Sequence, residues 1–179
     1  MAYGVVNLDS YDIMNIAAFR SAKAAFNVEN GSVLQLTAKS TDNFEGDVWT
    51  ANTPGSGEGL KNLWIVDEPV NGRIVDASGN VYDSVDNNPK NFVNLAGTVF
   101  NTHQLKVGEL VTLSADAIGG TKGVNTFVVA TNGKLKLQWS AAAVTGVSLK
   151  LIKQNDFAIA DNTWKQRTTA YQFEVVAVA

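Results

Sequence analysis

The sequence predicts a mainly β protein, an antiparallel sandwich or barrel with one N-terminal helix. Three observations lead to this fold class. Alternating apolar and polar segments recur after Val28, Asn-Gly pairs stand at 30–31, 71–72 and 132–133, and helical periodicity is absent after Phe26. Alternation with period two is typical of strands, and Asn-Gly favours the tight turns of hairpins. Short strands with frequent turns indicate a sandwich or barrel.

The helix is predicted near residues 10–25. Several alanines give this segment high helix propensity, and Asp9 or Ser10 can cap its first turn. An apolar stripe at a spacing of three supports it and consists of Ile13, Ile16 and Phe19. We expect residues 1–27 to form an N-terminal arm and helix, and residues 28–179 to form the β domain.

The clearest strand pattern is KLKLQW at 134–139. Its apolar side chains lie on one face and its polar side chains on the other, as expected for a half-buried strand. Further strands are expected at 63–66, 73–77, 125–131, 147–151 and 171–179. The glycine- and asparagine-rich stretches 50–62, 84–91 and 118–125 are predicted to be loops, which are natural contact sites and also natural connectors.

Two segments of the chain have nearly the same pattern. GSVLQLTA at 31–38 and GELVTLSA at 108–115 are both glycine-led and alternate with period two. Two interpretations are open: glycine-led strands that look alike by chance, or two related β units at 28–100 and 105–179. The second interpretation predicts that the two segments occupy equivalent strands.

Composition bounds the class of function. Only 17% of the residues are charged and the net charge is −3, which argues against a basic nucleic-acid binder. There are no cysteines, so a disulfide framework and a thiolate site are excluded. No apolar run approaches the roughly 18 residues of a membrane span, and the start lacks the pattern of a signal peptide. We therefore expect a protein that is made and assembled in a cytoplasm, with neither membrane nor nucleic acid as a partner.

Charge is unevenly distributed along the chain. Residues 1–100 hold 6 basic and 12 acidic side chains, a net charge of −6. Residues 101–179 hold 8 basic and 5 acidic side chains, a net charge of +3. Halves of opposite sign can attract between neighbouring copies, or they can neutralise each other within one monomer.

No motif for catalysis, metal binding or cofactor binding is present. His103 is the only histidine and has no nucleophile motif beside it, so we expect a structural or surface role for it. Asp42, Glu45 and Asp47 lack the spacing of a calcium loop, and the glycines near 55–59 lack phosphate-binding spacing. We expect no enzyme activity, no cofactor and no metal site. Tryptophans can form a sugar platform or anchor a core or interface, and the chain has four of them: Trp49, Trp64, Trp139 and Trp164.

The order of several phrases resembles small structural proteins of tailed bacteriophages. These phrases are MAYGVVNLDSYD, VENGSVLQLTA, GLKNLWIV, FNTHQLKVGELVTLSADAIGG and TAYQFEVVAVA. The chain is similar to head decoration, or cement, proteins encoded beside the major capsid protein in phages of Gram-positive bacteria. The resemblance implies a β-rich fold, display on the outer surface of an icosahedral head, and contacts with the capsid shell. It carries no individual site residue over to this sequence.

These observations predict a non-enzymatic virion protein that binds the outside of a phage capsid and stabilises it. Many copies, each binding modestly, would act together by multivalency. We expect the major capsid protein and further copies of the chain as partners. The expected contact residues are Tyr3, Val5, Val6, Trp49, Pro54, Leu60, Asn88 and Pro89. Two alternatives remain open: a tail-tube subunit that uses loop 50–62 to bridge stacked rings, and a carbohydrate-binding β-sandwich.

Overall fold

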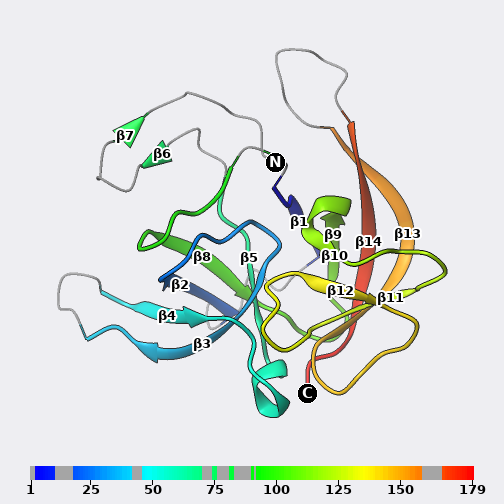
Figure 1. Cartoon of the computed structure of the whole chain (residues 1–179), viewed down its shortest axis with the longest axis horizontal. Helices are drawn as coiled ribbons and strands as arrows, with labels where there is room; N and C mark the ends of the chain where they lie inside the picture. Colours follow the sequence, from blue (N-terminus) through cyan, green and yellow to red (C-terminus); the bar gives the residue numbers. More distant parts are fainter. Residues whose placement is uncertain are drawn as a thin grey trace.

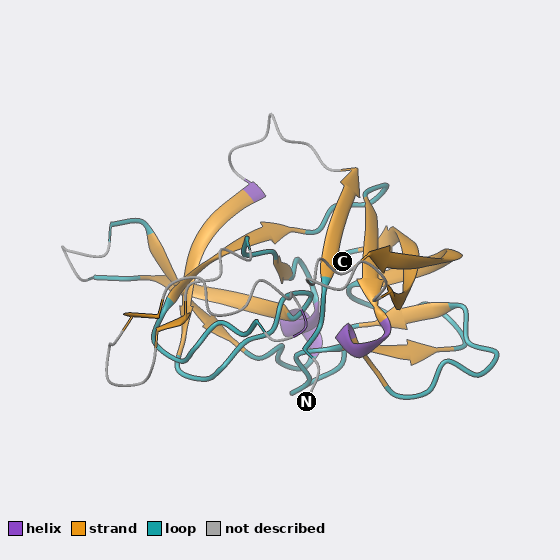
Figure 2. Ribbon diagram, turned by 90° about the horizontal axis from the view of Figure 1, so that it is seen from above, coloured by secondary structure: helices purple, strands orange, loops and turns teal. Residues whose placement is uncertain are grey.

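The computed structural model describes residues 3–10, 18–41, 46–69, 74–75, 81–82, 90, 92–158 and 167–179. This part of the chain is mainly β, which confirms the coarse fold class. Five strands close into a barrel, seven form a curled sheet beside it, and two short strands pair separately (Figure 1). Strands dominate the coloured ribbon in Figure 2, where the helical turns are short.

The barrel consists of strands from the first part of the chain, in the closed order β2-β4-β3-β5-β8. β2 and β4 run parallel and the other neighbours run antiparallel. The bounds are β2 Phe19–Ala24, β3 Val33–Lys39, β4 Val48–Asn52, β5 Trp64–Val66 and β8 Val99–Gln104. The interior is a buried cluster of Ala22, Ala24, Val28, Leu34, Ala51, Val66 and Phe100. Small alanines on the β2–β4 pair leave room for the larger side chains opposite, because the interior of a five-stranded barrel is narrow.

The curled sheet has the order β1-β9-β14-β13-β11-β12-β10. Its strands come from both ends of the chain, so the barrel is inserted between the first strand of this sheet and the remaining six. The bounds are β1 Val6–Ser10, β9 Leu110–Ser114, β10 Ile118–Gly119, β11 Phe127–Val129, β12 Leu137–Ser140, β13 Ser148–Ala158 and β14 Arg167–Ala177. The separate pair is β6 Ile74–Val75 with β7 Val81–Tyr82, and short 3-10 turns occupy Gly57–Leu60 and Ala115–Ala117.

One hydrophobic core joins the barrel to the sheet. Along β3 and β5 the side chains alternate: Leu34 and Val66 face the barrel interior, while Val33 and Ile65 face outward. The outward pair is nevertheless fully buried, because it packs in one cluster with sheet residues. That cluster includes Val111, Leu113, Leu137, Leu149, Phe173 and Val175. Each of these strands therefore contributes one face to the barrel interior and the other face to the core that is shared with the sheet.

The N-terminal helix predicted near 10–25 is not seen. The described part of that range is mostly β: β1 runs to Ser10 and β2 covers Phe19–Ala24, and residues 11–17 lie outside the described residues. Ala18, Ala22 and Ala24 suggested a helix through their propensity, but they are small residues buried in the fold, and Ala22 and Ala24 belong to the barrel core. Tertiary packing therefore overrides intrinsic propensity here.

The two similar segments lie in different sheets. Residues 33–39 form β3 of the barrel and residues 110–114 form β9 of the curled sheet. Each strand has an antiparallel neighbour on both sides, and each leading glycine has a positive φ, +81° at Gly31 and +91° at Gly108. Glycine tolerates this conformation because it has no Cβ. The shared sequence pattern thus matches a shared local geometry, and a common origin of two units stays a prediction.

Candidate functional site

One open end of the barrel carries the most distinctive group of side chains. It is formed by the first residues of β2, β4 and β5 and the last residues of β3 and β8. Ala22 pairs with Trp49 and Leu34 pairs with Trp64, so both tryptophans share the inward face with barrel-core residues. Arg20 precedes Ala22 by two residues and therefore faces the same interior.

The Arg20 guanidinium lies against both indoles. Its Cζ is 5.7 Å from the ring centroid of Trp49 and 5.6 Å from that of Trp64. These distances are in the range of cation–π attraction. All three side chains are half-buried, and the Thr102 hydroxyl donates a 2.8 Å hydrogen bond to the Arg20 carbonyl. The cation is therefore held at the mouth of the barrel by rings from two other strands.

A cleft of about 440 Å³ opens beside this cation and is lined by Phe19, Arg20, Ser21, Lys39, Asp47 and Trp49. Lys39 and Asp47 form an ion pair at its rim, and both side chains are exposed. The hydrogen bond and charge of Lys39, with the charge of Arg20, lower the pKa of Asp47, so this carboxyl is ionised at neutral pH. Exposed ion pairs contribute little stability, so Lys39 and Asp47 can exchange partners at small cost.

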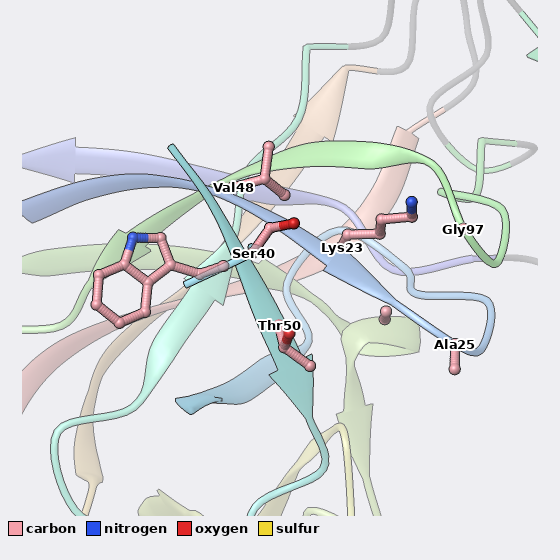
Figure 3. A pocket seen from close by; sticks show the side chains of 8 residues that line it. Lys23, Ala25, Ser40, Val48, Thr50 and Gly97 are labelled. Atoms are coloured by element: carbon pink, nitrogen blue, oxygen red, sulfur yellow. The ribbon is translucent and has the colours of Figure 1, made fainter. Parts of the chain in front are cut away.

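A second hollow of about 360 Å³ lies on the outer face of the parallel β2–β4 pair. Figure 3 shows the lining residues Lys23, Ala25, Ser40, Val48, Thr50 and Gly97. Val48 is buried although it faces away from the barrel interior. The hollow has mostly short side chains and no acidic group among its lining residues.

His103 lies where the barrel meets the sheet and is almost fully buried. Its Nε2 is 2.8 Å from Oε1 of Glu109, and the other Glu109 oxygen accepts the Lys106 N–H at 2.9 Å. The Phe19 ring lies 4.9 Å away, centroid to centroid. This arrangement connects β8 to the turn before β9 and fits the structural role expected for His103.

Two neighbouring acids follow β5. Burial raises the pKa of Asp67, and the charge of His103 opposes that shift. Burial also raises the pKa of Glu68, opposed by a 2.7 Å hydrogen bond from the Asn101 N–H and assisted by the Asp67 charge. Among the described residues no group of three or more His, Cys, Asp or Glu side chains is arranged to hold a metal ion.

The N-terminal contact residues are tied to their own chain. Val6 pairs with Leu113 in β9, and Val5 exchanges hydrogen bonds with Ser114 through its N–H and its carbonyl. The Tyr3 N–H donates to the Lys90 carbonyl at 2.8 Å. The side chains of all three predicted contacts are half-buried, so they expose only part of their surface to a partner.

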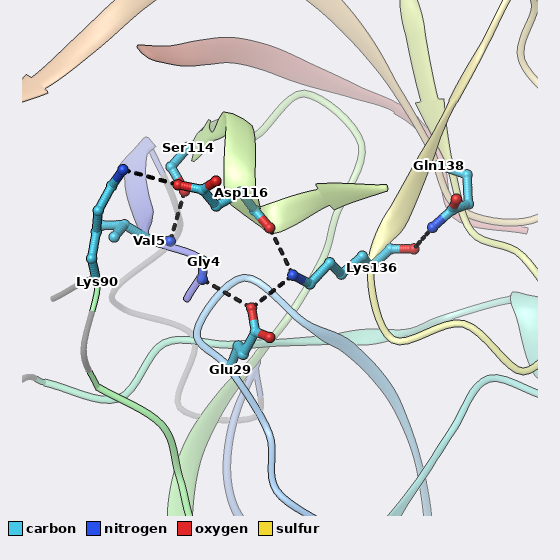
Figure 4. Close-up of polar contacts among 8 residues, drawn as sticks. All are labelled: Gly4, Val5, Glu29, Lys90, Ser114, Asp116, Lys136 and Gln138. Carbon is cyan, nitrogen blue, oxygen red and sulfur yellow. Dashed lines mark hydrogen bonds and ion pairs between the residues drawn. The ribbon is translucent and has the colours of Figure 1, made fainter. Parts of the chain in front are cut away.

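A polar network below β1 holds this segment in place (Figure 4). Glu29 Oε2 accepts the Gly4 N–H and pairs with Lys136 Nζ, both at 2.9 Å. Lys136 also donates to the Asp116 carbonyl at 2.8 Å, and the Asp116 carboxylate pairs with Lys90 at 3.0 Å. The network links the arm to the barrel part and to the sheet at once.

The other predicted contact residues that are described lie partly at the barrel mouth and partly in the protein interior. Trp49 lies at the barrel mouth, whereas Pro54 is buried and its carbonyl accepts the Gly133 N–H at 2.8 Å. Leu60 packs against the shared core. Asn88 and Pro89 lie outside the described residues.

The predicted loop 50–62 begins with the end of β4, which runs to Asn52, and its later part hydrogen-bonds to residues next to β13 and β14. The Leu60 carbonyl accepts the Val147 N–H at 2.9 Å, and the Asn62 N–H donates to Val178 at 2.7 Å. At Gly146, which has φ of +105°, a Cβ would come within 2.7 Å of the Leu60 oxygen, so this close approach requires glycine. The backbone of Pro54, Leu60 and Asn62, which a ring-bridging loop would offer to another subunit, is thus bonded within the chain.

Sequence patterns did not identify Arg20, Lys39 and Asp47 as a group with Trp49 and Trp64. Arg20 falls within the helix predicted near 10–25, so no strand partner was expected for it. Trp64 alternates with Val66 in a predicted strand, which is a signal for a shared face, but only the register between strands brings the two tryptophans to one cation.

Comparison with family models, with curated proteins and with solved structures found no match. In the part of the chain that is described, no helix has the length and apolar character needed to cross a membrane.

Proposed function

We propose that this chain is a non-enzymatic virion protein that binds the outside of a tailed-phage capsid and stabilises it. The sequence resemblance to head decoration proteins suggests the partner, the major capsid protein. The observation that carries the proposal is the ribbon formed by the outer halves of β13 and β14, which offers strand edges to a neighbour.

The ribbon extends past its neighbours in the sheet. β11 pairs with β13 only at Ser148–Lys150, and β9 pairs with β14 only at Ala170–Glu174. Beyond these points β13 and β14 continue to pair with each other as far as Ala158 and Arg167 (Figure 1). In the described part of the chain, no strand pairs with the outer edge of residues 152–158 or 167–169.

Unpaired edges are places where another chain can add a strand, and a two-stranded ribbon alone is only marginally stable. The side chains of residues 152–156 are all exposed, including Ile152 at 49%. Lys153 and Asp156 on the ribbon disfavour indiscriminate pairing, because a charged edge must find a complementary partner. A ribbon of this kind gains order and buried area when it docks on a capsid subunit or on a further copy of the chain.

The test is attachment to heads that lack the protein. Purified chain is incubated with such heads, sedimented, and counted per head by mass spectrometry. We expect Ile152→Asp/Gln154→Asp, which adds two charges to the exposed outer half of β13, to reduce the bound copies at least tenfold. Thr121→Asp/Val124→Asp is the matched control, because it adds the same charge to an exposed loop of the sheet.

Both variants should keep the melting temperature of the wild-type protein within a few degrees. Equal loss of binding in both variants, or normal binding of the ribbon variant, contradicts the proposal. Recovery of the chain in tails instead of heads would replace it with the tail-tube alternative.

A further inference from the structure

The open end of the barrel has the chemistry of a ligand site that is independent of the ribbon. Mouths of β-barrels are frequent binding sites, because strands from several parts of the chain fix the side chains around one opening. Here a cleft of about 440 Å³ presents a cation, the Trp49 indole and an ion pair, and the Trp64 indole packs on the same cation. We propose that this mouth binds a sugar that carries a carboxylate, with Arg20 pairing to the carboxylate and Trp49 packing on the ring.

Arg20 is set up for an anionic partner. The guanidinium has five N–H donors, and one of its nitrogens, Nη1, donates to the Phe19 carbonyl at 2.9 Å. No carboxylate among the described residues pairs with it, since Asp47 at the rim is paired with Lys39. Two indoles hold the guanidinium in place, so little side-chain freedom is lost when its remaining donors bind a carboxylate.

The walls of the cleft favour a sugar over an acidic peptide. Trp49 offers aromatic surface, on which the C–H face of a sugar ring can pack. The Asp47 carboxylate offers acceptors for sugar hydroxyls. The ionised Asp47 would repel a peptide with several acidic residues, whereas a single carboxylate opposite Arg20 and hydroxyls opposite Asp47 satisfy both charges.

The size of the cleft agrees with this ligand class. Ligand pockets run from about 300 to 1,000 Å³, and this cleft lies in the lower part of that range. Such a volume suits one or two sugar rings at the end of a chain. A glucuronic-acid residue is the simplest probe, because its neutral counterpart, glucose, differs only in the carboxylate.

The first experiment needs no substitution. Methyl glucuronide and methyl glucoside are titrated into the ¹⁵N-labelled wild-type protein, and the indole N–H signals of the four tryptophans are followed by NMR. We expect saturable shifts at Trp49 and Trp64 with glucuronide, at least tenfold weaker binding of glucoside, and no shift at Trp139. Equal binding of both sugars, no binding, or shifts that spare Trp49 and Trp64 would overturn the proposal.

The second experiment changes the cation. Arg20→Gln should weaken glucuronide binding about tenfold or more, the usual effect of losing a charge-assisted hydrogen bond, and leave glucoside binding unchanged. Arg20→Lys keeps the positive charge but loses the planar guanidinium that can pair with a carboxylate through two N–H groups. It should therefore weaken glucuronide binding by an intermediate amount. Arg167→Gln is the control, because it removes an arginine from the exposed ribbon with the same change in net charge. Similar loss in Arg20→Gln and Arg167→Gln would point to a long-range charge effect and contradict the assignment.

A third measurement separates the sugar from a protein ligand. An oligoglutamate peptide is added to the glucuronide complex, and tighter binding of the peptide at Trp49 and Trp64 would replace the sugar with an acidic segment. The ribbon variant Ile152→Asp/Gln154→Asp should bind glucuronide normally. The proposal of a sugar site and the proposal of capsid attachment can therefore be contradicted independently.

Discussion

The closed barrel and the curled sheet use β-structure in opposite ways. Every barrel strand has a neighbour on both sides, so the barrel offers no edge and presents only its ends and its outer face. The sheet leaves β1 and β10 at its edges and extends β13 and β14 as a ribbon beyond their neighbours. Closure favours a fixed, inward-facing ligand site, whereas open edges favour contact between chains. This difference is the basis for placing a small ligand at the barrel and a protein partner at the ribbon.

The two regions nevertheless share one hydrophobic core, so we expect the barrel and the sheet to unfold together. Val33, Leu63 and Ile65 from the barrel part pack in the same cluster as Val111 and Phe173 from the sheet. A shared core couples the regions, because neither can lose its packing without exposing apolar surface of the other.

The largest effect is expected from Phe173→Ala. Phe173 is fully buried in the shared core, so its truncation should cost about 3–5 kcal/mol of unfolding free energy. Urea unfolding followed by tryptophan fluorescence and by far-UV circular dichroism should give one coincident transition. Phe100→Ala, the matched change in the barrel core, should shift the same single transition. Two separate transitions would show that the barrel and the sheet fold independently.

A smaller effect is expected from Leu8→Ala in β1. Leu8 is buried in the shared core and its strand pairs with β9, so the change should cost about 2–4 kcal/mol. Binding of the folded protein to heads should be unchanged, since this side chain faces its own core. Normal stability together with weak head binding would instead make the N-terminal segment an attachment arm, as the sequence alone suggested.

The smallest effect is a change in pH dependence on Asp67→Asn. Burial raises the pKa of Asp67 in the folded protein, so the unfolded chain holds this proton less tightly. The stability linked to Asp67 is fully present below the ordinary carboxyl pKa of about 3.9 and is lost as the pH rises through the raised folded-state value. We expect the wild-type unfolding free energy to fall more steeply than that of Asp67→Asn across this window. Identical slopes in urea unfolding at several pH values would contradict the assignment.

The sequence by itself indicated the β class and several of the strands. Period-two alternation in GSVLQLTA and GELVTLSA fixed which side chains share a face, and Gly31 and Gly108 supply the positive φ before each strand. These features are local, so they can be read from neighbouring residues. The composition also excluded thiolate chemistry, because the chain has no cysteine.

Only the tertiary structure decided how the strands pair and what the alanine-rich segment becomes. Helix propensity at Ala22 and Ala24 is a fraction of 1 kcal/mol per residue, which is small against the packing of these alanines into a barrel with Phe100. The same pairing brings Arg20 of β2, Trp49 of β4 and Trp64 of β5 to one opening. Contacts between residues 29 to 44 positions apart are set by strand register and barrel closure, and no local pattern encodes them.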